Sequence, residues 1–138
     1  MTESFKSIKD YPGNYDIDYS ICTIVNDMNE YHLMKASFEK CGFTSNCEYL
    51  IANNCIQNEY DAYQAIGLFL KQAAGKYIIV VHQDVRCIDT RKVLDACLFQ
   101  LNENHPNWAI CGNAGAKDYH QYILNITDPS NKLPYSNL

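Results

Sequence analysis

The apolar and polar residues of this chain form blocks that predict strands and helices in alternation. The most distinctive block is an unbroken apolar run at residues 77–81, which begins soon after Gly75 and stops at the polar trio His82-Gln83-Asp84. Such a run is typical of a strand buried on both faces, as in parallel sheets covered by helices. Ligands of these sheets bind beyond the carboxyl ends of the strands, so the trio lies where a functional site is expected.

The rest of the pattern predicts four more strands and three helices. In chain order we expect a strand at 20–26, a helix from Asp27 to about Gly42, a strand at 48–52, a helix over 58–74, the apolar run, a helix between Asp89 and Pro106, and strands at 108–111 and 121–126. Asp27 and Glu30 have the spacing of a capping box, Asp89 can cap the third helix, and Gly42 suits a helix end.

Each predicted helix carries apolar residues at helical spacing along one face. They are Leu33, Met34, Phe38 and Cys41 in the first helix, Tyr63, Ile66, Leu70 and Ala73 in the second, and Val93, Leu94, Cys97, Leu98 and Leu101 in the third. Stripes of this kind are typical of helices that pack one side against a sheet.

The alternation of strands and helices predicts the fold class. Parallel pairing through right-handed crossovers gives a three-layer α/β, Rossmann-like domain, in which a mainly parallel sheet is flanked by helices. At 138 residues the chain is expected to form a single domain over residues 1–138. Residues 1–18 are expected to be an extended lead-in and residues 128–138 an irregular tail, because neither segment has a period.

Composition excludes several classes of partner. The net charge of −5 does not favour binding of nucleic acid. No apolar stretch approaches a membrane span of about 20 residues, and residues 1–18 lack an apolar signal region. The seven cysteines are odd in number and include no C-x-x-C pair, which favours free thiols packed as small apolar side chains. We therefore expect a cytoplasmic protein without a transmembrane segment.

Polar or small residues follow each of the first four predicted strands, and in a parallel sheet these strand ends lie along one edge. The four ends are Asn26-Asp27, Asn53-Asn54, His82-Gln83-Asp84 and Gly112-Asn113. Taken singly, each has a structural explanation as a helix cap, a turn or a loop glycine. Taken together, they form a candidate site.

The pair His82 and Asp84 is the most informative part of that site. Two residues apart on an extended segment, these side chains point the same way and can reach one ligand. Mg²⁺ and Mn²⁺ typically bind one or two carboxylates together with substrate phosphates, so Asp84 is a sensible ligand for a metal-bridged diphosphate. The sequence contains neither of the standard glycine-rich phosphate loops, which agrees with a metal bridge.

Several segments occur in an order found in one family. They are strands ending Val25-Asn26 and Asn53-Asn54, a helix that starts Asp61-Ala62-Tyr63-Gln64 and leads through Ala73-Ala74-Gly75-Lys76-Tyr77, the apolar run, His82-Gln83-Asp84-Val85, and Gly112-Asn113-Ala114-Gly115-Ala116. Over residues 20–117 this order resembles the family 2 glycosyltransferases of the GT-A fold, and within them the subgroup whose metal motif is His-Gln-Asp in place of Asp-x-Asp.

This resemblance implies a function and a role for each candidate residue. The family transfers a sugar from a nucleotide-activated donor to an acceptor. By resemblance, Asn26 and Asp27 together with Asn53 or Asn54 would surround the nucleoside, Tyr63 and Gln64 would flank the donor, His82 and Gln83 would lie beside the ribose or diphosphate, and Asp84 would hold Mn²⁺ or Mg²⁺. Asn53 and Asn54 depart from the acidic residues that many relatives carry there.

The resemblance also indicates what this chain lacks. Family members extend well beyond 138 residues, and their second half supplies the acceptor pocket and, in inverting members, a carboxylate base. The chain therefore resembles the donor-binding half, incomplete at its C-terminus, and we expect self-association through its exposed C-terminal side. No catalytic residue is assigned. Two alternatives stay open, namely a non-catalytic nucleotide-sugar-binding module or remnant, and an unrelated flavodoxin-like α/β binding domain.

Overall fold

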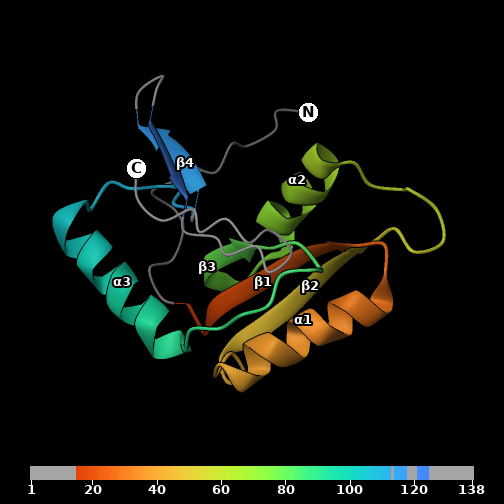
Figure 1. Cartoon of the computed structure of the whole chain (residues 1–138), viewed down its shortest axis with the longest axis horizontal. Helices are drawn as coiled ribbons and strands as arrows, with labels where there is room; N and C mark the ends of the chain where they lie inside the picture. Colours follow the sequence, from red (N-terminus) through yellow and green to blue (C-terminus); the bar gives the residue numbers. More distant parts are fainter. Residues whose placement is uncertain (1–14, 113, 118–120, 125–138) are drawn as a thin grey trace, which may run out of the picture. The chain divides into compact units, whose positions relative to one another are not determined.

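The computed structural model describes residues 15–112, 114–117 and 121–124 of the chain (Figure 1). The elements are β1 (Ile17–Val25), α1 (Met28–Lys40), β2 (Cys47–Asn53), α2 (Ala62–Gln72), β3 (Gly75–Val80), α3 (Arg91–Asn104), β4 (Ala114–Lys117) and β5 (Gln121–Leu124). The order of strands and helices is the one that the sequence predicts. The predicted lead-in and tail lie mostly outside the described residues, although Ile17 and Asp18 already belong to β1.

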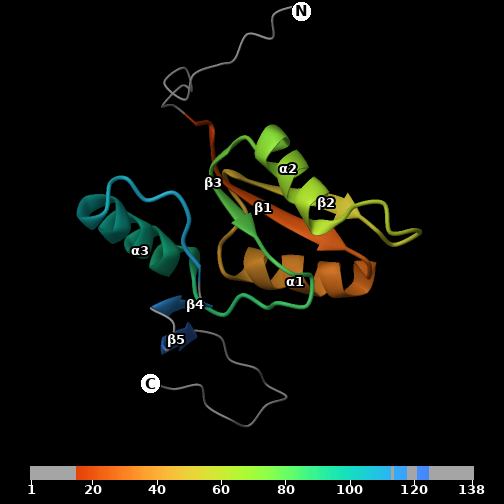
Figure 2. The ribbon, with the colours of Figure 1, turned by 90° about the horizontal axis from the view of Figure 1, so that it is seen from above.

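A three-stranded parallel sheet organises the first part of the chain. The strand order is β2-β1-β3, and both pairings of β1 are parallel. The crossover through α1 leads from β1 to β2 on one side of it. The crossover through α2 leads from β2 back past β1 to β3 on the other side. Because right-handed crossovers in opposite directions place their helices on opposite faces, α1 and α2 enclose the sheet (Figure 2). The predicted three-layer α/β class is confirmed.

The chain divides into two compact units, Met1–Asp95 and Ala96–Leu138. The first holds the parallel sheet, α1, α2 and the first turn of α3, and the second holds the rest of α3 and an antiparallel pair of β4 and β5. That residues 1–138 form a single domain, as the sequence predicts, stays a prediction.

The core of the first unit is built around β1. Residues 19–23 and Val25 of this strand are buried, so β1 is covered on both faces. The apolar run predicted to be buried in this way is instead β3, an edge strand of the described sheet, in which Val80 is 53% exposed. The prediction was wrong because an apolar run reports hydrophobicity, whereas burial also depends on a strand having neighbours on both sides.

The two ends of α1 follow the sequence signals closely. The Asp27 carboxylate accepts the backbone N–H groups of Asn29 and Glu30, as an N-cap does. At the other end Gly42 has a φ of 99°, and its N–H bonds to the carbonyl of Glu39. With the Phe43 N–H on the carbonyl of Phe38, this forms a Schellman motif, which satisfies two carbonyls at the helix end.

The predicted capping box at α1 forms only in half. The Glu30 carboxylate pairs with Arg86 rather than returning to the backbone of Asp27. A complete capping box is present at α2, where Asp61 caps the N–H of Gln64 and the Gln64 side chain accepts the N–H of Asp61. The spacing of the sequence correctly predicts Asp27 as the cap of α1. The third helical residue, Glu30, binds the nearby Arg86 guanidinium instead of the backbone.

The apolar stripe predicted on α2 faces outward. The buried residues of α2 are Ala65 and Phe69, which pack with Cys22 of β1 and Ala52 of β2. The predicted stripe residues Tyr63 and Leu70 are 90% and 64% exposed, and Ile66 is 39% exposed. Ala65 and Phe69 therefore form the sheet-facing side of α2, whereas Tyr63, Ile66 and Leu70 stay exposed.

Two predictions beyond β3 were also wrong. Helix α3 begins at Arg91, so Thr90 rather than Asp89 precedes its first residue. Residues 108–111 form no strand, and Ile110 is 92% exposed. The strand lies at β4, which pairs antiparallel with β5 across a short connection. An antiparallel pair of this kind needs only a short local connection, whereas parallel strands are joined by long crossovers.

No helix in the described ranges is both long and apolar enough to cross a membrane.

Gly75 offers a direct test of how β3 is held. A Cβ atom at this buried position would lie 2.5 Å from the backbone nitrogen of Ser20 and 2.6 Å from its hydroxyl. We expect Gly75→Ala to lower the free energy of unfolding by about 1–3 kcal/mol or more, because the backbone of β1 cannot move aside. Urea denaturation of the purified variant measures this loss.

Gly67 supplies the matched control. A Cβ atom there meets no atom within 4 Å, and the residue lies inside α2. Gly67→Ala should therefore stabilise the protein by about 0.5–1 kcal/mol. Equal effects of the two substitutions would contradict the close packing of β3 against β1.

Candidate functional site

The carboxyl ends of β1, β2 and β3 lie at one edge of the sheet, because the three strands are parallel. Two contacts join the ends. The Asn54 N–H donates to the carbonyl of Val25 at 2.6 Å, and the Gln83 side chain contacts Asn26. The prediction that the first three strand ends come together is confirmed. The fourth predicted end includes Asn113, which lies outside the described residues.

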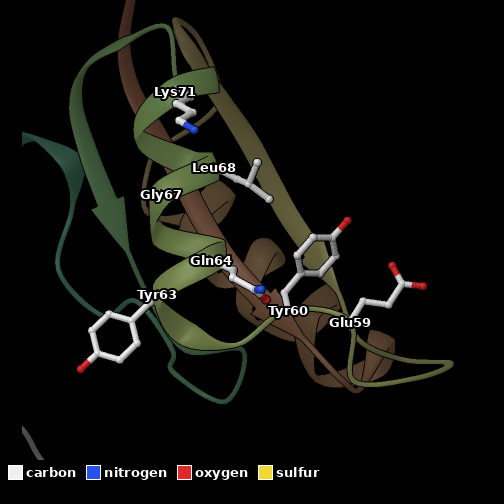
Figure 3. Close-up of a pocket in the computed structure, with 7 residues that line it drawn as sticks. All are labelled: Glu59, Tyr60, Tyr63, Gln64, Gly67, Leu68 and Lys71. Atoms are coloured by element: carbon white, nitrogen blue, oxygen red, sulfur yellow. The ribbon is translucent and has the colours of Figure 1, made fainter.

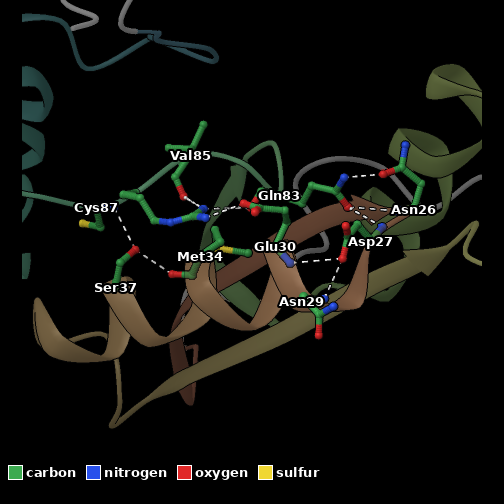
Figure 4. Close-up of polar contacts among 10 residues, drawn as sticks. Asn26, Asp27, Asn29, Glu30, Met34, Ser37, Gln83, Val85 and Cys87 are labelled. Carbon is green, nitrogen blue, oxygen red and sulfur yellow. Dashed lines mark hydrogen bonds and ion pairs between the residues drawn. The ribbon is translucent and has the colours of Figure 1, made fainter. Parts of the chain in front are cut away.

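Gln83 joins β3 to the start of α1. Its side-chain oxygen accepts the backbone N–H groups of Asn26 and Asp27 at 2.9 and 3.0 Å (Figure 4). Its side-chain nitrogen donates to the Asn26 carboxamide. The backbone N–H of Asp27 lies at the N-terminus of α1, where donors lack partners within the helix. The middle residue of the predicted trio is therefore a brace between two strand ends.

His82 and Asp84 flank this brace on a turn. The Val85 N–H bonds to the carbonyl of His82 at 3.2 Å, so residues 82–85 form a tight turn rather than the extended segment that the sequence argument assumed. Alternation of side chains along a strand does not apply there. Both side chains are nonetheless exposed, and neither has a hydrogen bond or ion pair with any described residue. They are free to meet a ligand.

The segment after the turn is fastened along α1 (Figure 4). Arg86 donates to the carbonyls of Gln83 and Val85, both at 3.1 Å, and pairs with the Glu30 carboxylate. About two turns further along α1, the Ser37 hydroxyl accepts the N–H of Cys87 at 2.9 Å.

A second anchor follows at the end of this segment. The Arg91 N–H bonds to the carbonyl of Cys41 at 2.8 Å, and the Arg91 guanidinium pairs with Asp18 at 2.5 Å. The same guanidinium lies 5.1 Å from the ring centroid of Tyr19 in β1. The segment is therefore held at both ends, which fixes the turn that carries His82 and Asp84.

Asn53 and Asn54 have different local tasks. The Asn53 carboxamide accepts the N–H of Cys55 at 2.9 Å, a turn contact. The Asn54 carboxamide accepts the N–H groups of Glu59 and Tyr60 at 3.1 and 3.0 Å and donates to the Tyr60 carbonyl at 2.9 Å. Asn54 therefore organises the loop that leads into α2. The nucleoside contact predicted for this pair stays a prediction.

Tyr63 and Gln64 lie in the first turn of α2, which follows that loop at the same edge of the sheet. Gln64 is engaged in the capping box, whereas the Tyr63 ring extends into solvent (Figure 3). A depression of about 430 Å³ runs along this side of α2, lined by Glu59, Tyr60, Tyr63, Gln64, Gly67, Leu68 and Lys71. The predicted position of Tyr63 and Gln64 beside a sugar nucleotide stays a prediction.

The donor set at this edge fits one kind of metal site. No group of three or more His, Cys, Asp or Glu side chains suited to a metal occurs in the described part of the chain. Asp84 supplies a single exposed carboxylate without a competing partner among these residues. A closed protein cage is thus not supported, but one carboxylate with substrate phosphates is the usual arrangement for Mg²⁺.

Two of the cysteines are poorly suited to act as nucleophiles. All seven are free thiols, as predicted. Burial raises the pKa of Cys22 to about 12, and burial together with the neighbouring Cys41 raises the pKa of Cys87 to about 12. Thiols with such pKa values stay protonated at neutral pH and are poor nucleophiles. These two cysteines serve as packing groups.

Sequence patterns missed the contacts that fix the site. The contacts of Arg86 with Glu30, of Cys87 with Ser37 and of Gln83 with Asn26 join residues 50 or more positions apart. No local spacing in the sequence indicates them. The single available signal was the position of Gln83 between two residues with site chemistry. That position alone does not tell that the Gln83 side chain binds the backbone of Asn26 and Asp27.

Comparison with known proteins gives limited information. No family model matches the chain. The chain is 33% identical over 100 residues to a protein of Fuscovulum blasticum named "ATP synthase subunits region ORF 6". The aligned region covers 71% of this chain and 40% of that relative, so the chain spans less than half of its length. The name records a gene region and no activity.

The trio can be divided experimentally into structural and exposed residues. We expect Gln83→Ala to lower the free energy of unfolding by about 1 kcal/mol, because two backbone N–H groups lose their acceptor. Asp84→Ala and His82→Ala should change it by less than about 0.5 kcal/mol, since both side chains are exposed and free. Urea denaturation of the three variants decides the matter. Equal losses would show that the trio acts as a single structural unit.

Proposed function

We propose that this chain is a glycosyltransferase, or the donor-binding half of one, that binds a nucleoside-diphosphate sugar through Mn²⁺ or Mg²⁺. One observation carries the proposal, namely that Gln83 braces two strand ends and leaves His82 and Asp84 exposed beside it. The position is the carboxyl edge of a parallel sheet, where ligands of α/β proteins bind. The motif resemblance adds the reaction class.

Each exposed residue has a role that follows from its chemistry. Asp84 would hold the cation against the diphosphate, and the cation would offset the negative charge that develops on the departing nucleoside diphosphate. His82, on the same turn, would donate a hydrogen bond to the ribose or diphosphate. Asn26, Asp27 and Gln83 would form the rigid floor below them. The free thiols also support the proposal of a cytoplasmic location.

Metal-dependent binding tests the central contact. We expect uridine and guanosine diphosphates to bind more tightly with Mn²⁺ or Mg²⁺ than with a chelator, and Asp84→Ala to remove that difference. Titration calorimetry with and without EDTA measures both effects. Asp89→Ala is the matched control, because Asp89 is an exposed carboxylate in the same connecting segment, and its loss should leave the metal effect unchanged. Equal affinity of the unmodified protein in EDTA would refute the proposal.

A second measurement separates an enzyme from a binding module. A glycosyltransferase holds the anomeric carbon ready for attack, so slow release of free sugar from the donor is expected where no acceptor is supplied. We expect this hydrolysis to require the metal and to be lost in Asp84→Ala. Chromatography of the released sugar after long incubation measures it. Metal-dependent binding without any hydrolysis would identify a non-catalytic nucleotide-sugar-binding module instead.

A further inference from the structure

The outward face of α2 carries an apolar stripe within the first unit, which we define as Tyr63, Ile66, Gly67 and Leu70 and call the α2 stripe. Ile66 and Gly67 each lie three or four residues from both Tyr63 and Leu70, so the four residues lie on one side of the helix. The side chain of Tyr63 is 90% exposed and that of Leu70 is 64% exposed. The opposite side of α2 is already buried by Ala65 and Phe69. A helix that is apolar on both sides is typical of one that is covered on both sides.

Gly67 indicates that the covering group comes close to the helix backbone. Glycine inside a helix is less stable than alanine by about 0.5–1 kcal/mol, so its use needs a reason. Packing among the described residues supplies none, because a Cβ atom at Gly67 would meet none of their atoms within 4 Å. Gly67 and Tyr63 also line the depression that runs along α2 (Figure 3). Close approach of another backbone is the ordinary use of glycine at such a position.

The order of residues in the stripe identifies what approaches. Tyr63 and Leu70 are equally distant from the point midway between Ile66 and Gly67. If two α2 helices pack antiparallel across a two-fold axis at that point, Tyr63 of one copy meets Leu70 of the other. Ile66 of each copy then lies opposite Gly67 of the other copy near the axis, where the missing side chain of glycine leaves room for it. A surface that is complementary to itself in this way suits a symmetric pair.

The charges beside the stripe agree with the same arrangement. Lys71 lies at the C-terminal end of α2, exposed and without an ion pair among the described residues. Glu59 precedes the helix, and among the described residues its carboxylate accepts only the Gln57 side chain, at 3.0 Å. Both residues line the depression. Antiparallel packing brings Lys71 of one copy beside Glu59 of the other, whereas parallel packing would align like charges.

We propose that the α2 stripe is an interface at which two copies of this chain associate, with their α2 helices antiparallel and crossing between Ile66 and Gly67. This surface differs from the C-terminal side at which the sequence led us to expect self-association. It is independent of the proposed glycosyl transfer. One short helix per copy offers less area than the roughly 800 Å² per partner of a standard interface, so the dimer is in reversible equilibrium with the monomer.

Sedimentation-velocity ultracentrifugation over a wide range of protein concentration tests the proposal. We expect a concentration-dependent shift from monomer to dimer, and Leu70→Glu should weaken dimerisation by about tenfold or more, equivalent to 1.4 kcal/mol. Leu33→Glu is the matched control, because Leu33 is 54% exposed on α1, on the other side of the sheet. A chain that stays monomeric throughout, or equal weakening by both variants, overturns the proposal.

Two further variants address the geometry without disturbing the fold. Gly67→Ala should raise the unfolding temperature of the monomer and yet weaken dimerisation, because the new methyl group separates the crossing backbones. Lys71→Glu alone and Glu59→Lys alone should each weaken the dimer, and the double charge reversal should restore it. Undiminished dimerisation of Gly67→Ala, or failure of the double variant to recover, would show that another surface or another partner occupies this face.

Discussion

The contact between Gly75 and Ser20 sets the register of β3 on β1, and the placement of the candidate site follows from it. The Gly75 N–H donates to the Ser20 hydroxyl at 2.8 Å, and that hydroxyl donates to the Glu48 carboxylate of β2. Glu48 also accepts the N–H of Ala74 at 2.7 Å. One small network therefore joins all three strands near their amino ends. A one-residue shift of β3 would turn every later side chain to the other face.

The same register brings Gln83 to the end of β1. Five residues beyond Gly75 the strand ends, and the chain must turn away from the sheet, because β3 has reached the edge where α1 begins. Because the two ends lie close together, the Gln83 side chain can accept the N–H groups of Asn26 and Asp27. Contacts of Arg86 with Glu30 and of Cys87 with Ser37 then fasten the segment along α1. A site on such a segment is preorganised, although it lies on a loop.

The sequence predicts what depends on local chemistry. Asp27 and Gly42 mark the ends of α1 because a side-chain cap and a left-handed residue are local requirements. Strand and helix order is equally predictable, because periodicity reports which elements can be half buried. Burial itself is less predictable, as β3 and the face of α2 demonstrate. Whether an apolar residue such as Tyr63 or Leu70 is covered depends on which elements meet it, and that information is not local.

The candidate site was likewise predictable from the sequence only in part. Parallel pairing made the gathering of Asn26, Asn54 and Gln83 predictable, yet the sequence could not tell that the last two are engaged with the protein. A ligand that used the Asn54 carboxamide would have to break contacts within its loop, each of which contributes about 0.5–1.5 kcal/mol. His82 and Asp84 present no such cost, since no described residue binds them. Recognition at this edge therefore begins at the exposed pair, and any choice among nucleotide bases must come from groups that can contact the base while the loop of Asn54 stays closed.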